Sequence, residues 1–197
     1  MTARGSIRRA AAMAALACLV TLPGLDPRPD RAVAQTIFNF NNLAGPTAAQ
    51  SNAPSVEDYM RDNPHAKFMG AGGFVIDGNR LYCGRRPVIV DDKFDSWGGA
   101  FPGFLIWNNA MTEKLPTVVK LYIFSHECGH QFVGRDEKAA DCFAMRRGRR
   151  YGWLNDAGME QICGFIGHLR ADDEHAGGSD RCAYMRQCYA DHALDKK

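Results

Sequence analysis

The sequence predicts an α+β fold, in which a small N-terminal β-sheet or hairpin is followed by a helical part. Residues 72–109 contain short apolar runs bounded by Gly, Pro, Asn and Asp, the pattern of strands joined by turns. After residue 112 the apolar residues recur at helical spacing. Strands that precede helices, rather than alternate with them, are typical of α+β domains. With 46% hydrophobic and 23% charged residues, the 197-residue chain is expected to be globular rather than disordered.

Residues 1–34 have the features of a secretory signal peptide. Three arginines (Arg4, Arg8 and Arg9) precede an apolar run over residues 10–22, and Ala32-Val33-Ala34 is a small-x-small cleavage site. The apolar run is too short for a spanning helix, so we expect an exported protein, periplasmic or secreted, with no stable membrane span after cleavage. An earlier cleavage site and an uncleaved anchor are the alternatives.

The charge and the cysteines of the remaining chain narrow its class. Beyond residue 34 there are 19 basic and 20 acidic residues, a balance that predicts no nucleic-acid partner. Six of the seven cysteines remain, and an even count in an exported chain predicts up to three disulfides, with 15 possible pairings.

The strand region is preceded by a segment of loop-like composition. Residues 35–70, rich in Asn, Gly and Pro, are predicted to be a flexible lead-in, with a short helix over residues 55–61 capped by Ser55. The domain itself is expected over residues 71–197. Its strand region should contain a hairpin turning at Asp77-Gly78, strands at 87–90 and 104–107, and a polar loop over 91–99.

Four helices are expected after the strands. The first begins at Thr112 or Pro116 and ends at Gln131, with Gly134 as its stop and Asp136 as the cap of the next. The other three are expected over residues 137–150, 155–170 and 179–190.

The first of these helices carries an H-E-x-x-H motif, formed by His126, Glu127 and His130. At about 100° per residue, two histidines four residues apart lie on one helix face and can bind one zinc ion (Zn²⁺), with the glutamate beside a metal-bound water. Cys128 points away from that face, which favours core packing or a disulfide over metal ligation.

A catalytic zinc needs a third protein ligand, and two neighbouring residues are candidates. Glu137 begins an E-x-x-x-D unit at helical spacing, in which Asp141 would orient an imidazole. Asp136 lies ten residues after His126, the offset of the third ligand in metzincins, although Gly134 is one place late for that pattern. We favour Glu137.

These motifs resemble those of the gluzincin zinc peptidases, especially the HtpX-like and Ste-type CaaX-protease group. That group typically has H-E-x-G-H and then E-x-x-A-D, as in Glu137–Asp141, and a later H-P-x-x-x-x-R element whose spacing matches His175 and Arg181. The resemblance covers about residues 103–181. The chain departs from the group in having only six residues between His130 and Glu137 and in lacking its multiple membrane spans.

The resemblance implies a small exported relative with a zincin-like domain that cleaves peptide or protein substrates. In that mechanism zinc lowers the pKa of a bound water and Glu127 acts as the general base. His175 would stabilise the oxyanion, and Arg181 would hold the adjoining loop. The strand at 104–107 could pair with extended substrate. The alternatives are a metzincin-type protease that uses Asp136, and a disulfide-stabilised secreted binding protein with a structural or vestigial zinc site.

Overall fold

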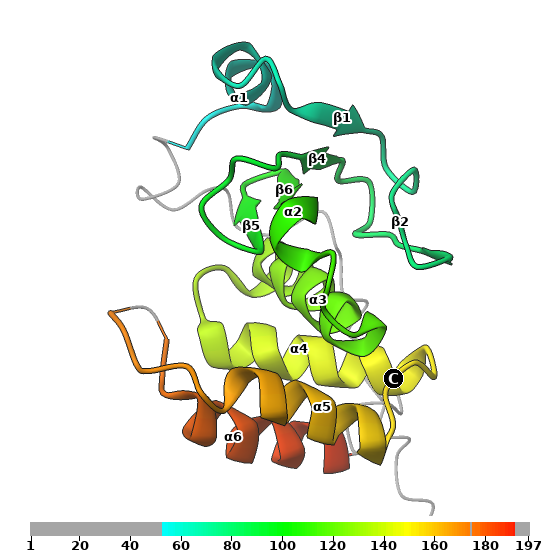
Figure 1. The fold of residues 1–197 in the computed structure, drawn as a ribbon, viewed down its shortest axis with the longest axis vertical. Coiled ribbons are helices and arrows are strands. Elements are labelled where there is room, and N and C mark those ends of the chain that lie inside the picture. The colour runs from blue at the N-terminus through cyan, green and yellow to red at the C-terminus, as the bar shows by residue number, and fades with distance from the viewer. Residues whose placement is uncertain (1–52, 174, 192–197) are drawn as a thin grey trace, which may run out of the picture. The chain divides into compact units, whose positions relative to one another are not determined.

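A small mixed sheet followed by packed helices forms the described part of the protein, which in this computed structural model is residues 53–173 and 175–191 (Figure 1). The sheet order is β1-β4-β6-β5, where β4 and β6 are parallel and the other pairs antiparallel. The strands are β1 (Lys67–Met69), β4 (Val88–Val90), β5 (Gly98–Phe101) and β6 (Phe104–Trp107). The α+β class is therefore confirmed. The predicted signal peptide, and the lead-in before residue 53, lie outside the described residues.

A hairpin of β2 (Val75–Ile76) and β3 (Asn79–Arg80) stands beside the sheet, as predicted. Its two-residue turn has positive φ at both Asp77 (47°) and Gly78 (81°), the backbone that an Asp-Gly pair adopts most readily between antiparallel strands. The predicted strands at 87–90 and 104–107 are present as β4 and β6.

Two strands, β1 and β5, were not predicted. The expected loop over 91–99 ends in β5, whose Gly-Gly-Ala-Phe sequence has little strand propensity and is held by its pairing with β6. This strand lies at the sheet edge, so β6, which we expected to meet substrate, is instead enclosed between β4 and β5.

The described part of the expected lead-in, residues 53–70, is a folded part of the domain rather than a flexible segment. It forms α1 (Val56–Asp62), capped by Ser55 as predicted, and then β1. The Tyr59 hydroxyl donates to Oδ2 of buried Asp91 (2.9 Å), and His65 Nε2 lies 2.8 Å from Oδ1 of the same carboxylate. These long-range contacts could not be seen in the composition of the segment.

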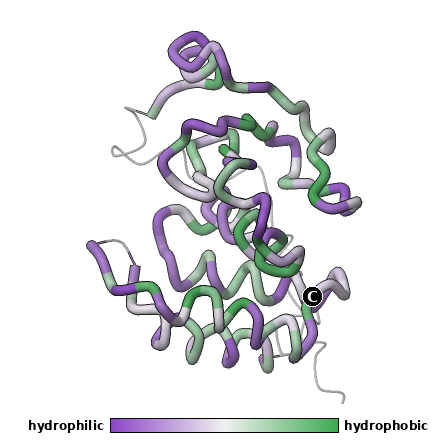
Figure 2. The backbone as a smooth tube through the Cα atoms, viewed as in Figure 1, coloured by the Kyte–Doolittle hydropathy of each residue, from purple (hydrophilic) through white to green (hydrophobic). Residues whose placement is uncertain are grey.

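The helices are α2 (Asn109–Thr112), α3 (Thr117–Val133), α4 (Glu137–Arg150), α5 (Asp156–Ile166) and α6 (Gly178–Ala190). The helix α3 packs against β5, β6, α4 and α5, and it is apolar around most of its first three turns (Figure 2). The helix α5 is shorter than predicted, because the chain turns back after Ile166. There Gly178 passes so close to α5 that a Cβ would lie 1.7 Å from the Ile166 carbonyl oxygen.

Three disulfides connect these elements, as the cysteine count predicted. Cys83–Cys128 joins the segment after the hairpin to α3, Cys142–Cys188 joins α4 to α6, and Cys163–Cys182 joins α5 to α6. Cys128 is thus a disulfide partner rather than a ligand. Within the described residues, no helix is long and apolar enough to cross a membrane.

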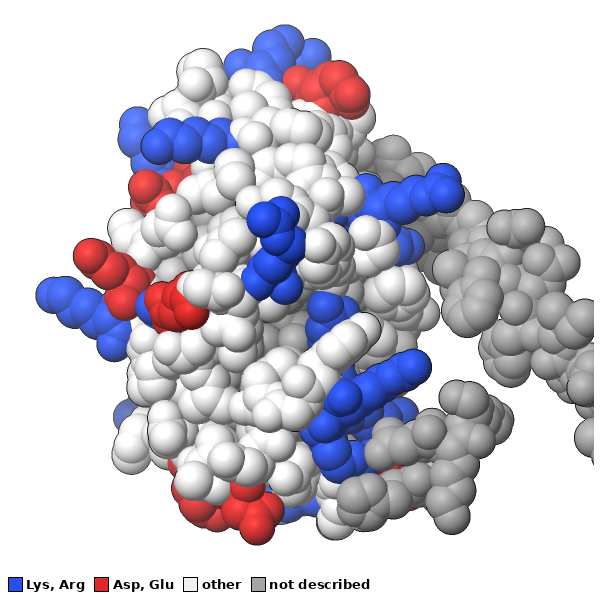
Figure 3. Space-filling model, turned by 90° about the vertical axis from the view of Figure 1, so that its right-hand side faces the viewer, with Lys and Arg blue, Asp and Glu red and all other residues white. Residues whose placement is uncertain are grey.

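Charged side chains of both signs lie on the surface of the described residues (Figure 3). On the face drawn in Figure 3, Lys and Arg side chains and Asp and Glu side chains occur at several separate places with uncharged surface between them.

The most extensive helix contact among the described residues is between α3 and α4. A Cβ on Gly129 would lie 3.1 Å from the Ala140 Cα and 3.2 Å from its carbonyl oxygen, so a side chain here would push the α4 backbone away from α3. We predict that Gly129→Ala destabilises the fold by about 1–3 kcal/mol through overpacking, measured by chemical denaturation. The matched control is Gly164→Ala in α5, where a Cβ meets nothing within 4 Å; this variant should be neutral or slightly stabilised. Equal stabilities would contradict the packing argument.

Acid unfolding tests the Asp91 contacts. Burial raises the pKa of the Asp91 carboxyl, but hydrogen bonds from the Lys93 backbone N–H, Tyr59 and His65 outweigh it and lower the pKa below its ordinary value. The stabilisation is therefore complete above about pH 4 and is lost as the pH falls below that. Asp91→Asn should unfold at a lower urea concentration than the unmodified protein at pH 7. Its stability should also fall less than that of the unmodified protein between about pH 5 and about pH 3. Asp62→Asn, at an exposed site, should behave as the unmodified protein does.

Candidate metal centre

Two histidines of α3 point their Nε2 atoms at one another. The Nε2 atoms of His126 and His130 are 3.1 Å apart. The other ring nitrogen of each faces an acceptor, since His126 Nδ1 lies 2.8 Å from Asp141 Oδ1 and His130 Nδ1 lies 2.7 Å from the Gly134 carbonyl oxygen. Hydrogen bonding thus assigns the proton of each neutral ring to Nδ1, and two Nε2 lone pairs converge on one point. A metal ion between the rings, or a second proton on one of them, would satisfy both lone pairs.

Glu137, the first residue of α4, completes the group. Its Oε2 lies 3.1 Å from His126 Nε2 and its Oε1 lies 3.3 Å from His130 Nε2. Oε2 is buried, yet it accepts no hydrogen bond of acceptable geometry. Ligand atoms around a tetrahedral zinc at 2.0–2.1 Å are about 3.3 Å apart, near the separation of the two nitrogens and near the distance from each nitrogen to one of the two Glu137 oxygens. His126, His130 and Glu137 therefore form a group that could hold a metal ion.

The short connection between α3 and α4 decides which acidic residue joins this group. Gly134, at φ 68°, ends α3 as predicted. Asp136 caps α4, its Oδ1 accepting from the Ala139 backbone N–H at 2.9 Å. The side chain of Asp136 is thereby used in the helix cap, and Glu137, one residue later, faces the histidines.

Behind the histidines, Asp141 is at the centre of a buried hydrogen-bond network. It lies one turn after Glu137, where the sequence placed it, and it is 1% exposed. Arg181 donates from Nε to Oδ2 (2.9 Å) and from Nη2 to Oδ1 (2.8 Å). Tyr122 donates its hydroxyl to Oδ1 (2.7 Å) and accepts from Arg181 Nη2 (3.0 Å). Arg181 therefore fixes the acceptor of His126, whereas we had expected it to hold the His175 loop.

Tyr122 was missed by the sequence reasoning. Its signal was its place four residues before His126, on the same face of α3. The start of this helix is an apolar run, and a tyrosine in such a run is equally expected to pack in the core.

The surroundings of His126 favour a positive charge. Burial lowers the pKa of His126, but the carboxylates of Asp141 and Glu137, each beside one of its ring nitrogens, outweigh burial and raise the pKa to about 9. Burial opposes the ionisation of Asp141, yet His126 and Arg181 hold the pKa of that carboxyl well below its usual range. The same carboxylates that favour the protonated form of His126 would also favour a metal ion at its Nε2.

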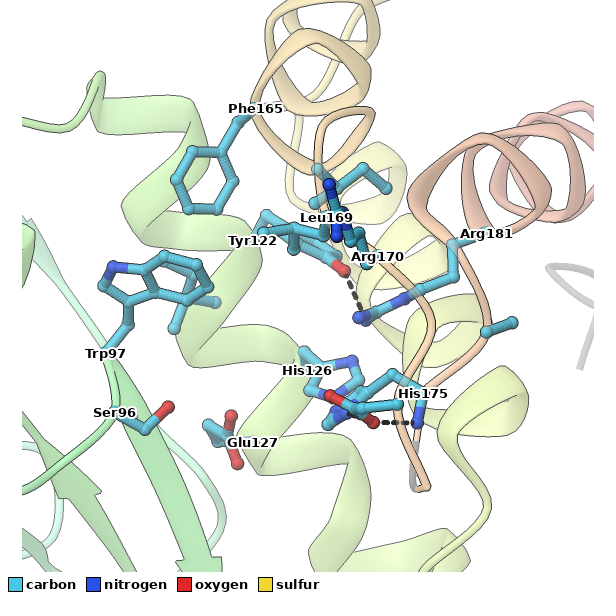
Figure 4. Close-up of a pocket in the computed structure, with 15 residues that line it drawn as sticks. Ser96, Trp97, Tyr122, His126, Glu127, Phe165, Leu169, Arg170, His175 and Arg181 are labelled. Carbon is cyan, nitrogen blue, oxygen red and sulfur yellow. Dashed lines mark hydrogen bonds and ion pairs between the residues drawn. The ribbon is translucent and has the colours of Figure 1, made fainter.

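Glu127 lies beside the group on the same helix, facing β5. It is partly buried, and burial raises the pKa of its carboxyl above the ordinary value. A Cβ at Gly98 would come within 3.2 Å of Glu127 Cγ, so the glycine lets the edge strand run directly over this side chain. Both residues line a cavity of about 330 Å³ together with His126, His175 and Arg181 (Figure 4).

His175 reaches the group from the loop between α5 and α6. Its Nε2 lies 3.2 Å from Glu137 Oε2. Asp172 fixes the ring, since its Oδ1 accepts from the His175 backbone N–H (2.7 Å) and lies 3.1 Å from Nδ1. The side chains that the sequence singled out, apart from Asp136, are thus brought together around one point.

No protein-family model, curated protein or solved structure matches this chain in the comparisons made. Its function is therefore inferred from the geometry of this centre and from the sequence.

The network around Asp141 makes a prediction about metal affinity. Asp141→Asn removes the charged acceptor of His126 and should weaken metal binding by about 10–100-fold, measured by competition with a chelator. Glu160→Gln is the matched control, because Glu160 forms an exposed ion pair with Arg186 on α6. Equal affinities of the two variants would show that Asp141 does not support the ligands.

Proposed function

We propose that this protein is an exported, zinc-dependent peptidase that hydrolyses peptide bonds. The observation that carries the proposal is the convergence of His126, His130 and Glu137 with a second carboxylate, Glu127, beside them on a cavity. The H-E-x-x-H motif and its resemblance to gluzincins support the same reaction class.

Zinc is the metal that this donor set favours. Two imidazoles and one carboxylate within 4.8 Å of one another suit zinc, whereas calcium and magnesium prefer oxygen ligands. Three protein ligands also leave one position open, as catalytic zinc sites require.

The remaining residues can then carry the proton transfers. Zinc, when bound, supplies a Lewis acid that makes a water nucleophilic near neutral pH and polarises a carbonyl. Glu127 accepts the proton of the attacking water and passes it to the departing amine. A raised pKa suits Glu127 to both tasks, because the protonated and ionised forms then differ less in free energy. With protons on both ring nitrogens, His175 would donate to the negative charge that develops on the carbonyl oxygen, while Asp172 orients its ring.

The location follows from the cysteines and the N-terminus. Three disulfides indicate an oxidising compartment. We propose that residues 1–34 direct export as a cleaved signal peptide, which would place the enzyme in the periplasm or outside the cell.

Metal analysis and one substitution test the proposal. The purified protein should contain about one zinc per chain and should lose peptidase activity on removal of the metal. Glu127→Gln should retain the zinc and lose activity by at least about 10²-fold, because the base is gone and the ligands are intact. Zinc content is measured by mass spectrometry and cleavage with a peptide mixture. Bound zinc without any cleavage would favour the alternative of a secreted binding protein with a structural or vestigial site.

Two neighbouring substitutions separate the candidate ligands. Glu137→Ala should lose zinc, whereas Asp136→Ala should keep it and lose about 1 kcal/mol of stability, because only a helix cap is removed. The reverse result would favour a metzincin-type site that uses Asp136.

A further inference from the structure

The proposed base, Glu127, is held by packing rather than by hydrogen bonds. Among the described residues, none forms a hydrogen bond with its carboxylate. Its stem instead lies against the start of β5, where a Cβ on Gly98 would be 3.2 Å from Glu127 Cγ and 3.3 Å from Ile123 Cγ2. Figure 4 shows Glu127 on the side of α3 that faces the strands. The direction of the Glu127 carboxylate therefore depends on the position of β5.

The strand β5 is itself held on one side only. It is the last strand in the sheet order, paired with β6 alone among the described strands, and its Gly-Gly-Ala-Phe sequence has little strand propensity. Before its first residue, the Trp97 carbonyl oxygen accepts from the Asn108 backbone N–H (3.1 Å). The distance of β5 from α3 therefore depends strongly on what holds its other end, at Phe101.

The Gln131 side chain, one turn after Glu127 on α3, holds that end. Its Nε2 donates to the carbonyl oxygens of Phe101 (2.7 Å) and Phe104 (3.1 Å), which are the last residue of β5 and the first of β6. Its Oε1 accepts from the backbone N–H of Gly103, in the turn between the two strands (3.0 Å). One amide thus fastens the whole turn to α3.

Arg86 fixes the orientation of this amide. It donates from Nε to Gln131 Oε1 (2.9 Å) and from Nη2 to the Gln131 carbonyl oxygen (3.3 Å), and its guanidinium lies 4.7 Å from the Phe132 ring centroid. A guanidinium only donates and a carbonyl only accepts, so the amide oxygen must face Arg86 and the nitrogen must face the turn. All four hydrogen bonds that the amide can form are then made.

Glu127 and Gln131 meet the two ends of the same strand. They are four residues apart and lie on one face of α3, so Glu127 contacts the start of β5 and Gln131 its end. Removing the two amide donors would leave two part-buried carbonyls unpaired and release the turn from the helix. The strand could then move away from Glu127 and leave its carboxylate without a fixed direction.

We propose that Gln131 is a positioning residue, which holds β5 where Gly98 packs against Glu127 and thereby directs the Glu127 carboxylate. The inference rests on the peptidase function proposed above. The hydrogen bonds of the Gln131 side chain include none of the three candidate metal ligands, so metal binding does not depend on it.

Steady-state kinetics of two variants test the assignment. Gln131→Glu removes both donors and keeps the size of the side chain, whereas Gln131→Ala removes the amide without adding charge. Both should keep about one zinc per chain and lower kcat by at least ~10-fold, with KM changed by less than ~3-fold, because the metal and the substrate still bind while the base is misdirected. Gln161→Glu, which adds the same charge at an exposed position of α5, should change neither constant.

The outcomes separate this inference from the proposed function. Cleavage that depends on zinc and Glu127, with kcat unchanged in both Gln131 variants, overturns the assignment and leaves the peptidase proposal intact. A fall in kcat in Gln131→Glu alone assigns the effect to the added charge and also overturns it. Loss of zinc from both variants would show that Gln131 supports the metal group rather than the base.

Binding of acetohydroxamate provides a measurement that does not require cleavage. This probe binds a metal as an anion and leaves its proton with a neighbouring base, here Glu127. In calorimetry on the zinc-loaded protein, Glu127→Gln should weaken binding by at least ~10-fold. Gln131→Ala should weaken it by at least ~3-fold, but should have no further effect when combined with Glu127→Gln.

The combined variant decides the result. Additive losses, or unchanged affinity in Gln131→Ala, would show that Gln131 does not act through Glu127, which overturns the assignment. No zinc-dependent binding to the unmodified protein would overturn the peptidase proposal and the assignment with it.

Discussion

The site depends on the close packing of α3 against α4 at Gly129 and Ala140. His126 and His130 belong to one helix, but the third member of the group belongs to the next, so the distance between the two helices decides whether three ligand atoms can meet. The missing Cβ of Gly129 lets the Ala140 backbone approach, and Glu137 and Asp141, one turn apart on α4, then face His126 together. One helix contact therefore positions both a candidate ligand and the residue that orients a ligand.

Burying the charged groups of this site reduces the free energy of unfolding of a small domain. Asp141 and His126 are buried and Arg181 is mostly so, and buried ionic networks contribute little net stability even when every hydrogen bond is formed. The disulfides offset this cost, since each typically contributes about 2–4 kcal/mol by constraining the unfolded chain. They also join the elements that carry the site: Cys83–Cys128 holds α3 between His126 and His130, and Cys142–Cys188 joins α4, next to Asp141, to α6, which carries Arg181.

Local sequence signals predicted much of the candidate site. The positions of His126, His130, Glu137 and Asp141 follow from helical periodicity, and Gly134 and Asp136 have the backbone roles that their residue types favour. The failures concern contacts between distant segments. Residues 67–69 and 98–101 become strands because β4 and β6 pair with them, and neither composition nor alternation reveals that. Arg181 was placed near the site, but its partners, Asp141 and Tyr122, lie 40 and 59 residues away in the chain.

The unpredicted edge strand bears most directly on function. The candidate ligands on α3 and α4 would not by themselves give the cleft a direction if its opposite wall were an irregular loop. Because β5 runs alongside α3, with Gly98 against Glu127, the cleft has a peptide backbone on one side and the proposed base on the other. A strand edge has a direction, and the metal group marks one point along it. These two facts distinguish the part of the cleft before that point from the part after it, and the cavity beside Glu127 includes the point itself.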